Sequence, residues 1–323
     1  MLKKKIAAAF LSIMLAVSCL PFTNACADGV VIGDVDGDGS VQATDALLVL
    51  RASLDMESFT PEQSEKADIN ADGSIDSSDA LFILKIAVRE LAGTGRAVEL
   101  GSLFEYEKPV KGIDVSFWQG DIDFKKVKES GVDFVIIRAG GATDDPSENH
   151  KDVDPRRQGV DSCFEKNYAA AKAAGLNVGV YWYSFAENKQ QALREAESCL
   201  KAIEGKKLEY PVFYDIENNY QFDKGQAFCS ELMKTFCEKI NDNGYYAAFY
   251  MSTYFATNYL DDEVKSSYDC WLAQWSTPIT YAGDYGMWQM GVTQVDGING
   301  DVDDDVSYIN YPLYIKARKL NGW

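Results

Sequence analysis

Two carboxylates, Asp215 and Glu217, end an apolar, aromatic-rich run that reads YPVFYDIE. In a β-strand, side chains two positions apart leave the same face with Cα atoms roughly 6.6 Å apart, so both carboxylates are expected to enter one site. A carboxylate pair of this kind is suited to acid-assisted bond cleavage. The alternative is a structural role, in which backbone amides or an arginine such as Arg138 hold the pair, and the pair alone does not decide between the two.

The chain of 323 residues has a single histidine, His150, which lies in a polar stretch. This composition argues against Ser-His-Asp and Cys-His triads and against zinc sites that depend on histidine. If the chain is an enzyme, carboxylates must carry out its chemistry. The net charge of −19 argues against nucleic acid and anionic membrane surfaces as partners.

Residues 1–27 have the pattern of a secretory signal peptide. Three lysines at 3–5 precede an apolar stretch over 6–22, and the small residues of 25–27 favour cleavage before Asp28. A lipoprotein signal ending at Cys19 is the alternative. We therefore expect a secreted, extracellular protein. No later segment approaches the roughly 20 apolar residues of a membrane span.

Removal of this segment leaves an odd number of cysteines, which argues against a disulfide framework. We expect them to be buried free thiols. They are Cys163, Cys199, Cys229, Cys237 and Cys270.

Residues 34–45 fit a twelve-residue calcium loop, with oxygen ligands at positions 1, 3, 5, 9 and 12, a backbone carbonyl at 7 and glycine at 6 for a sharp turn. Residues 68–79 repeat the pattern 34 positions later. Two complete copies predict two structural calcium ions, with a solvated acidic turn as the alternative. The predicted ligands are Asp34, Asp36, Asp38, Ser40, Gln42 and Asp45 in the first loop, and Asp68, Asn70, Asp72, Ser74, Asp76 and Asp79 in the second.

Each loop runs directly into an apolar helical stretch, 46–54 after the first and 80–88 after the second. With aspartate rather than glutamate at position 12, this duplication resembles the type I dockerin domain of cellulosomal bacteria. The resemblance implies a small, all-α, calcium-folded module over 28–93 that binds a cohesin module on a scaffold protein. A linker is expected over 94–107.

Apolar runs alternate with amphipathic helical stretches over 108–323, which predicts a parallel sheet. Eight such runs predict a barrel, and the short last connections predict that it is incomplete at its end. The fold class expected is α/β, an incomplete TIM-like barrel of the (β/α)5β3 type. The expected strands are 111–116, 134–140, 177–185, 210–217, 245–252, 270–275, 285–290 and one near 300–306, and the clearest helices are 163–174, 189–203 and 226–243.

In such a barrel, chemistry gathers at the C-terminal ends of the strands. Polar residues recur there, and crowded carboxylates shift each other's pKa so that one can stay protonated beside an ionised neighbour. Tryptophans could add sugar-stacking platforms, although core packing is the alternative. The polar residues are Asp114, Gln119, Arg138, Tyr181, Tyr183, Asp215, Glu217, Gln274, Gln289 and Asp303, and the tryptophans are Trp118, Trp182, Trp271, Trp275 and Trp288.

Seven motifs in order resemble the family 25 glycoside hydrolases, the Chalaropsis-type lysozymes, over essentially all of 108–323. The resemblance implies hydrolysis of the β-1,4 bond between N-acetylmuramic acid and N-acetylglucosamine in peptidoglycan, with no cofactor for catalysis. The motifs are KGIDVSFWQGDIDF at 111–124, FVIIRAG at 134–140, GVYWYSF at 179–185, YPVFYDIE at 210–217, WLAQW at 271–275, MWQM at 287–290 and GINGDVDDD at 297–305.

The resemblance also implies roles for single residues. Glu217 is the expected general acid, and Asp215 is expected to orient the substrate's acetamido group or to stabilise the oxocarbenium-like state. Asp114 and Asp303 complete the acidic cluster. The expected sugar contacts are Tyr181, Tyr183, Arg138, Gln274 and Gln289. The family implies a substrate-assisted, retaining route, which residue spacing alone does not establish.

One departure from the family pattern is a long polar loop over 143–161, expected on the active face, either as part of the cleft or as a solvated insertion. Two other functions are weighed against a muramidase. A chitinase-like hydrolase is disfavoured because positions 210 and 213 hold Tyr and Phe, so the longer Asp-x-x-Asp-x-Asp-x-Glu series is absent. A non-catalytic wall-glycan binder is disfavoured because it need not keep four acids.

Overall fold

The structure is a computed structural model, and it describes residues 33–69, 73–90, 104–143, 145 and 153–323. The expected signal peptide, the expected ligands Asn70 and Asp72, most of the expected linker and His150 lie outside the described residues. Among the described residues, no helix is both long enough and apolar enough to cross a membrane.

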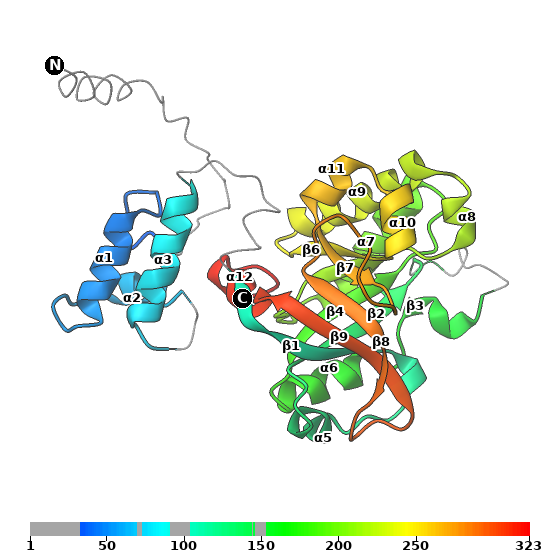
Figure 1. The fold of residues 1–323 in the computed structure, drawn as a ribbon, viewed down its shortest axis with the longest axis horizontal. Coiled ribbons are helices and arrows are strands. Elements are labelled where there is room, and N and C mark those ends of the chain that lie inside the picture. Colours follow the sequence, from blue (N-terminus) through cyan, green and yellow to red (C-terminus); the bar gives the residue numbers. More distant parts are fainter. Residues whose placement is uncertain (1–32, 70–72, 91–103, 144, 146–152) are drawn as a thin grey trace, which may run out of the picture. The chain divides into compact units, whose positions relative to one another are not determined.

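The described N-terminal residues form helices α1 (Ala43–Ala52), α2 (Pro61–Ala67) and α3 (Ser77–Glu90) (Figure 1). Helices α1 and α3 follow the two predicted loops, as expected. Helix α2 was not predicted from its sequence, PEQSEKA, which has no apolar period. Its start is fixed by Thr60, whose hydroxyl accepts from the Gln63 N–H, and by proline at the first helical position.

The C-terminal part is built on a sheet with the strand order β1-β9-β8-β7-β6-β5-β4-β2-β3, in which β1 also pairs with β2. This extra pairing closes a ring of eight strands, and the two-residue β3 lies outside it. Pairs are parallel from β1 round to β8, whereas β9 is antiparallel to both of its neighbours. The strands are β1 (Glu105–Val115), β2 (Phe134–Gly141), β3 (Gly159–Val160), β4 (Asn177–Tyr183), β5 (Val212–Asp215), β6 (Ala247–Ser252), β7 (Asp269–Ala273), β8 (Met287–Gln294) and β9 (Asp301–Ile309).

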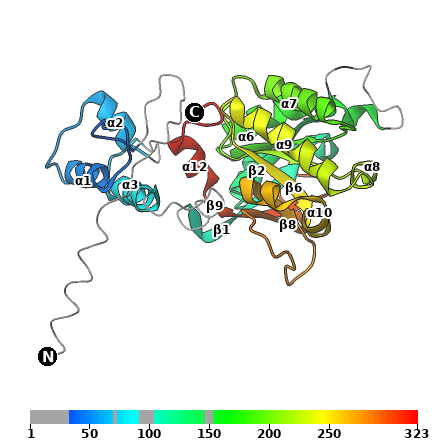
Figure 2. The ribbon, with the colours of Figure 1, turned by 90° about the horizontal axis from the view of Figure 1, so that it is seen from above.

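Helices cover the outer side of the parallel strands β2, β4, β5, β6 and β7 (Figure 2). Helix α7 (Lys189–Ile203) shows why: Ala192, Ala196, Cys199 and Ile203 recur at spacings of four, three and four, and all are buried. No helix connects β7 to β8 or β8 to β9, whose connections are fully described, which agrees with the expectation that the last connections lack full helices. The other helices are α5 (Phe124–Glu129), α6 (Phe164–Ala173), α8 (Asn219–Phe222), α9 (Gln226–Asp242), α10 (Thr253–Tyr259), α11 (Asp262–Ser267) and α12 (Tyr311–Ala317), with 3-10 turns η1 (Phe117–Gln119) and η3 (Pro155–Arg157).

Alternate strand residues face two different cores. Phe134 and Ile136 of β2 belong to the core inside the ring, whereas Val135 and Ile137 pack between sheet and helices. The inward series continues to Arg138, which lies at the end of the ring where the parallel strands finish. Inward-facing positions along one strand are therefore apolar inside the ring and polar at its end, which forms the mouth of the barrel.

Several expected strand bounds shift by a few residues, and two of the shifts concern the linker and the site. Strand β1 begins at Glu105, so the linker expected to run to 107 ends earlier. The pairing of β1 with β9 is irregular between Glu105 and Val110, around Pro109. Strand β5 ends at Asp215, so Glu217 lies just beyond the strand, and the argument from spacing on one strand face does not apply to it. A capping box at Asn218 starts α8 and turns the chain out of the sheet.

All five cysteines of the C-terminal part are free, and four of them are buried. The prediction of free thiols rather than disulfides is confirmed for these residues.

Candidate active site

A cavity of about 340 Å³ lies at the mouth of the barrel. Asp114 of β1 and Asp215 of β5 reach it from parallel strands, and Asp303 of β9 reaches it from the antiparallel one. Its size suits part of a sugar chain, because ligand pockets commonly enclose about 300–1,000 Å³. The lining residues are Asp114, Trp118, Arg138, Arg157, Tyr181, Tyr183, Asp215, Glu217, Tyr250, Trp271, Trp275, Gln289 and Asp303.

The structure brings eight of the nine predicted catalytic and sugar-contacting residues to this cavity. The ninth, Gln274, does not line it. Its amide nitrogen donates to the carbonyls of Ser276 (2.8 Å) and Pro278 (2.9 Å), and its amide oxygen accepts from Thr253 and Thr280. Gln274 therefore fixes the loop after β7, and the structure does not support its expected role as a direct sugar contact.

Asp114 is a buried member of the acidic cluster. Its Oδ2 accepts from Gln289 Nε2 at 2.9 Å, and Gln289 Oε1 in turn accepts from the Tyr250 hydroxyl at 3.0 Å. Burial, followed by the neighbouring charge of Asp303, raises the pKa of Asp114 to about 8. The hydrogen bond to Gln289 holds the Asp114 carboxyl in one orientation, and the raised pKa favours its protonated form.

Asp215 and Glu217 share the same environment. Burial and then the charge of Glu217 raise the pKa of Asp215 well above its ordinary value. Burial also raises the pKa of Glu217, while the positive charge of Arg157 opposes this shift. Asp215 Oδ1 is buried and has no hydrogen-bond partner among the described residues, so a polar group of a bound ligand could pair with it.

Four of the five candidate tryptophans divide into two groups, and the fifth, Trp288, is partly buried and donates through Nε1 to the Gln274 carbonyl at 2.9 Å. Trp182 and Trp271 are buried, and Trp271 donates through Nε1 to Asp305 Oδ1 at 2.8 Å. Trp118 and Trp275 are each 61% exposed and line the cavity, so these two are the candidates for stacking on sugar rings.

Sequence reasoning missed the roles of three groups. Arg157, from the polar loop before β3, lines the cavity, so this part of the loop is not a solvated insertion. Tyr250 on β6 also lines the cavity, and its alternation with the outward-facing Phe249 could have indicated this. Asp305, two residues after Asp303, is fully buried, and burial raises its pKa well above the ordinary value.

A second polar network lies behind the strand ends. Glu195 of α7 accepts from the Phe185 N–H (2.7 Å) and from the Tyr214 hydroxyl (2.5 Å). The Tyr214 hydroxyl also contacts Ser184 Oγ at 2.9 Å, and Ser184 Oγ accepts from Gln221 Nε2 at 2.9 Å. Ser184 and Tyr214 directly follow and precede cavity residues, so this network ties the end of β4 to the end of β5.

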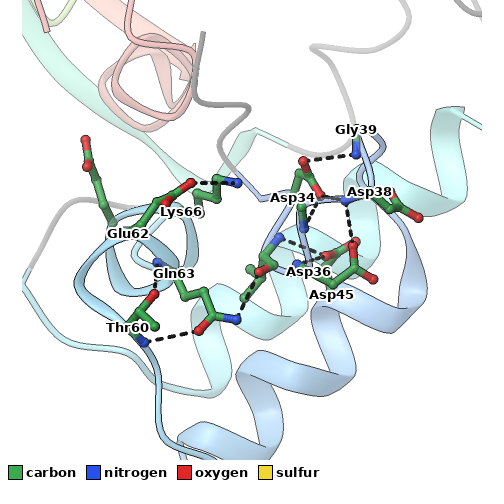
Figure 3. Close-up of polar contacts among 12 residues, drawn as sticks. Asp34, Asp36, Asp38, Gly39, Asp45, Thr60, Glu62, Gln63 and Lys66 are labelled. Atoms are coloured by element: carbon green, nitrogen blue, oxygen red, sulfur yellow. Dashed lines mark hydrogen bonds and ion pairs between the residues drawn. The ribbon is translucent and has the colours of Figure 1, made fainter.

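The first predicted calcium loop has the geometry of a cation site (Figure 3). Carboxylate oxygens of Asp34, Asp36 and Asp38 lie within 4.8 Å of one another. Calcium contacts oxygen at about 2.3–2.6 Å, so one ion could touch all three. The buried Asp45 Oδ1 accepts from the Val35 N–H at 2.8 Å, which folds the loop back on the start of α1. These residues fit calcium.

The second loop repeats this arrangement where it is described. The Asp79 carboxylate accepts from the N–H groups of Ile69 (3.1 Å) and Asp76 (2.9 Å), as Asp45 accepts from Val35 and Gln42 in the first loop. Asp68 Oδ2 accepts from the Gly73 N–H at 3.0 Å, as Asp34 Oδ2 accepts from Gly39 at 3.2 Å. Both glycines have positive φ, 92° and 87°, as position 6 requires.

Two family models match the chain. The model described as "Glycosyl hydrolases family 25" matches residues 113–297, and the model described as "Dockerin type I domain" matches residues 32–86.

Relatives of known name match the C-terminal part. The "Autolytic lysozyme" of Clostridium acetobutylicum is 31% identical over 201 residues, covering 61% of this chain and 55% of the relative. "Lysozyme M1" of Streptomyces globisporus is 28% identical over 214 residues, covering 60% of this chain and 66% of the relative. The chain therefore spans between half and two thirds of the length of these relatives.

Among solved structures, a family 25 glycosyl hydrolase from Bacillus anthracis superposes with a TM-score of 0.53 at 18% sequence identity. The superposition covers 68% of this chain and 97% of that one. This similarity concerns the fold.

Proposed function

Because the chain belongs to glycosyl hydrolases family 25, we propose that it is a muramidase that cuts the β-1,4 bond between N-acetylmuramic acid and N-acetylglucosamine in peptidoglycan. The observation that carries the proposal is the cavity itself. Asp114, Asp215, Glu217 and Asp303 meet there, and burial raises the pKa of each. Such a cluster can hold one proton ready for a leaving group while another member is ionised.

In the proposed mechanism, Glu217 donates its proton to the glycosidic oxygen as the bond to the anomeric carbon breaks. Burial raises its pKa, which favours the protonated form that this step requires. After the first sugar leaves, the Glu217 carboxylate takes a proton from the attacking water, so the residue returns to its starting state.

Asp215 is the proposed partner of the substrate's acetamido group. Its unpartnered Oδ1 would accept from the acetamido N–H, which orients the acetamido oxygen toward the anomeric carbon and stabilises positive charge there. This oxygen then acts as the internal nucleophile, and water opens the resulting ring with overall retention. Trp118 and Trp275 at the rim would stack on neighbouring sugars.

We assign the barrel to the (β/α)5β3 type, since helices follow the first five strands of the ring and three strands end it. The N-terminal module is proposed to be all-α and to hold two structural calcium ions, one in each loop. As a type I dockerin domain, it would attach the enzyme to a cohesin module of a cellulosome-type scaffold, after secretion directed by residues 1–27.

The test is wall lysis by the wild type and by Glu217→Gln. General acid catalysis is typically worth about 10²–10⁴ in rate, so the variant is expected to lose at least that factor while still binding glycan. Glu197→Gln, an exposed glutamate on α7, is the matched control and should behave as the wild type.

Product analysis then identifies the bond. A muramidase leaves muramic acid at the new reducing end, whereas N-acetylglucosamine there would indicate a different hydrolase. Near-normal lysis by Glu217→Gln would contradict its assignment as the acid and move that role to Asp114 or Asp303.

A further inference from the structure

Arg157 brings a guanidinium into the otherwise acidic cavity. It ends the 3-10 turn η3, and its carbonyl accepts from Arg138 Nη2 at 2.6 Å, which anchors the backbone of the loop on β2. Its guanidinium carbon lies 4.6 Å from the centre of the Tyr183 ring and 5.7 Å from that of Phe185. The side chain is therefore held against the end of β4, and the backbone anchor does not depend on it.

The arginines around this site differ in their partners. Arg138 is buried, with Nη1 at 3.8 Å from Asp161 Oδ2. Arg156 binds Asp154 at 2.6 Å and lies over Trp118. Among the residues that the structure describes, no carboxylate oxygen lies within 4.0 Å of the Arg157 guanidinium. Arg157 is thus the cavity-lining cation whose charge no contacting acid neutralises within the described part of the chain.

We propose that Arg157 forms an anion subsite beside the catalytic carboxyls, which binds a carboxylate carried by the glycan chain. The proposal rests on the proposed muramidase function and adds what the site selects. A guanidinium presents paired N–H donors that match both oxygens of a carboxylate, and such charge-assisted bonds are roughly twice as strong as neutral ones.

The neighbouring acids do not forbid an anion there. Burial raises the pKa values of Asp215 and Glu217 and so disfavours the negatively charged form of each carboxyl. Arg157, Asp215 and Glu217 line the same cavity, which places the guanidinium beside the proposed catalytic carboxyls.

Peptidoglycan carries carboxylates in two places, on the lactyl ether of muramic acid where no peptide is attached, and on the stem peptide. Glycans built only from N-acetylglucosamine carry none. Arg157 would therefore favour the first class of substrate over the second.

The experiment compares wild type, Arg157→Gln and Arg157→Lys on two substrates, peptide-bearing glycan strands and strands freed of peptide by an amidase. Each is used as it is and with its carboxyls blocked as methylamides. We expect Arg157→Gln to lose about 10- to 100-fold in kcat/KM on one unblocked substrate, mainly through KM, and little on its blocked form. The loss for Arg157→Lys should be intermediate, because lysine keeps the positive charge but lacks the paired N–H donors of the guanidinium.

The matched control is Arg318→Gln, which removes an exposed arginine that does not line the cavity and should behave as the wild type on every substrate. Loss confined to peptide-free strands identifies the lactyl carboxylate, and loss confined to peptide-bearing strands identifies the stem. Equal losses on blocked and unblocked substrates would show a merely structural role and overturn the proposal.

Binding separates this inference from the proposed function. Calorimetry in the Glu217→Gln background compares charged and blocked strands without turnover. A preference for charged strands that disappears with Arg157→Gln supports the subsite even if the wild type cuts no wall. Equal affinity for both forms refutes it even if the wild type is an active muramidase.

Discussion

Glu195→Gln tests whether the network behind the strand ends is maintained at a cost in stability. The wild-type carboxylate accepts two hydrogen bonds, from the Phe185 N–H and the Tyr214 hydroxyl. Glutamine has one acceptor oxygen, so its amide nitrogen, which can only donate, must face one of these two donors. Tyr214 cannot simply turn its proton to Ser184, because Ser184 Oγ already accepts from Gln221 and from the Ala186 N–H. The variant should therefore hold the ends of β4 and β5 less firmly.

The magnitude follows from the pKa of Glu195, which burial raises from 4.5 to about 7. A carboxyl whose pKa is raised in the folded state contributes stability that is present below the unfolded value and lost as pH rises through the folded value. At 1.36 kcal/mol for each pKa unit, the shift corresponds to about 3 kcal/mol between pH 4 and pH 8. Glutamine does not titrate, so the variant lacks this loss.

Thermal unfolding at pH 4 and pH 8 measures the effect. For a domain of this size, 1 kcal/mol moves Tm by about 2–4 °C, so Glu195→Gln should gain about 6–12 °C relative to wild type on going from pH 4 to pH 8. Its kcat should nevertheless fall on the order of 10-fold with little change in KM, because misplaced catalytic groups slow the chemical step. Other buried acids titrate equally in both proteins and cancel in the difference.

The control is Glu197→Gln on the exposed face of the same helix, whose Tm should follow that of wild type at both pH values. Parallel Tm curves for wild type and Glu195→Gln would refute the reasoning that a buried, ionised Glu195 is retained for positioning.

Two further predictions follow from the calcium loops and from the general acid. Chelation should unfold the N-terminal module, because its crowded aspartates repel one another without metal. Limited proteolysis with and without calcium measures this unfolding. The double variant Asp34→Ala, Asp68→Ala should also abolish cohesin capture, while wall lysis stays within twofold of the wild type. A module equally resistant to protease in chelator would contradict the calcium assignment. Burial raises the pKa of Glu217, and the charge of Arg157 opposes this shift. Arg157→Gln should therefore move the alkaline limb of the kcat/KM profile to higher pH. An alkaline limb that stays in place or moves to lower pH would contradict the assignment of Glu217 as the general acid.

Regular periodicity made much of the barrel predictable. The bounds of α7 match the expectation of 189–203 because its apolar spacing is regular, and β2 is within one residue of its expected range. Helix α2 was missed because its seven residues bury too little apolar surface to leave a periodic signal. The pattern Thr60-Pro61-Glu62-Gln63 is nevertheless a helix-start signature and could have indicated it.

Strand parity explains which predicted site residues reach the cavity. Asp114 and Arg138 alternate with apolar residues that pack under the helices, such as Ile113 and Ile137, so they must face inward. Gln274 differs because Trp271 faces inward and Leu272 outward, which gives position 274 the outward parity. Its placement beside the loop could have been predicted by counting from Trp271.

Counting alternate positions along a strand does not predict the placement of Arg157 or Glu195. Arg157 lies on a loop without a period, and its backbone is anchored by Arg138, 19 positions earlier, which donates to its carbonyl. Glu195 lies among the buried residues of α7, where a glutamate contradicts the apolar pattern. That contradiction is itself informative, because a buried acid destabilises the fold unless it is paired and is retained where position matters. A polar residue at a core position of an outer helix therefore predicts a positioning network, although its partners require the fold.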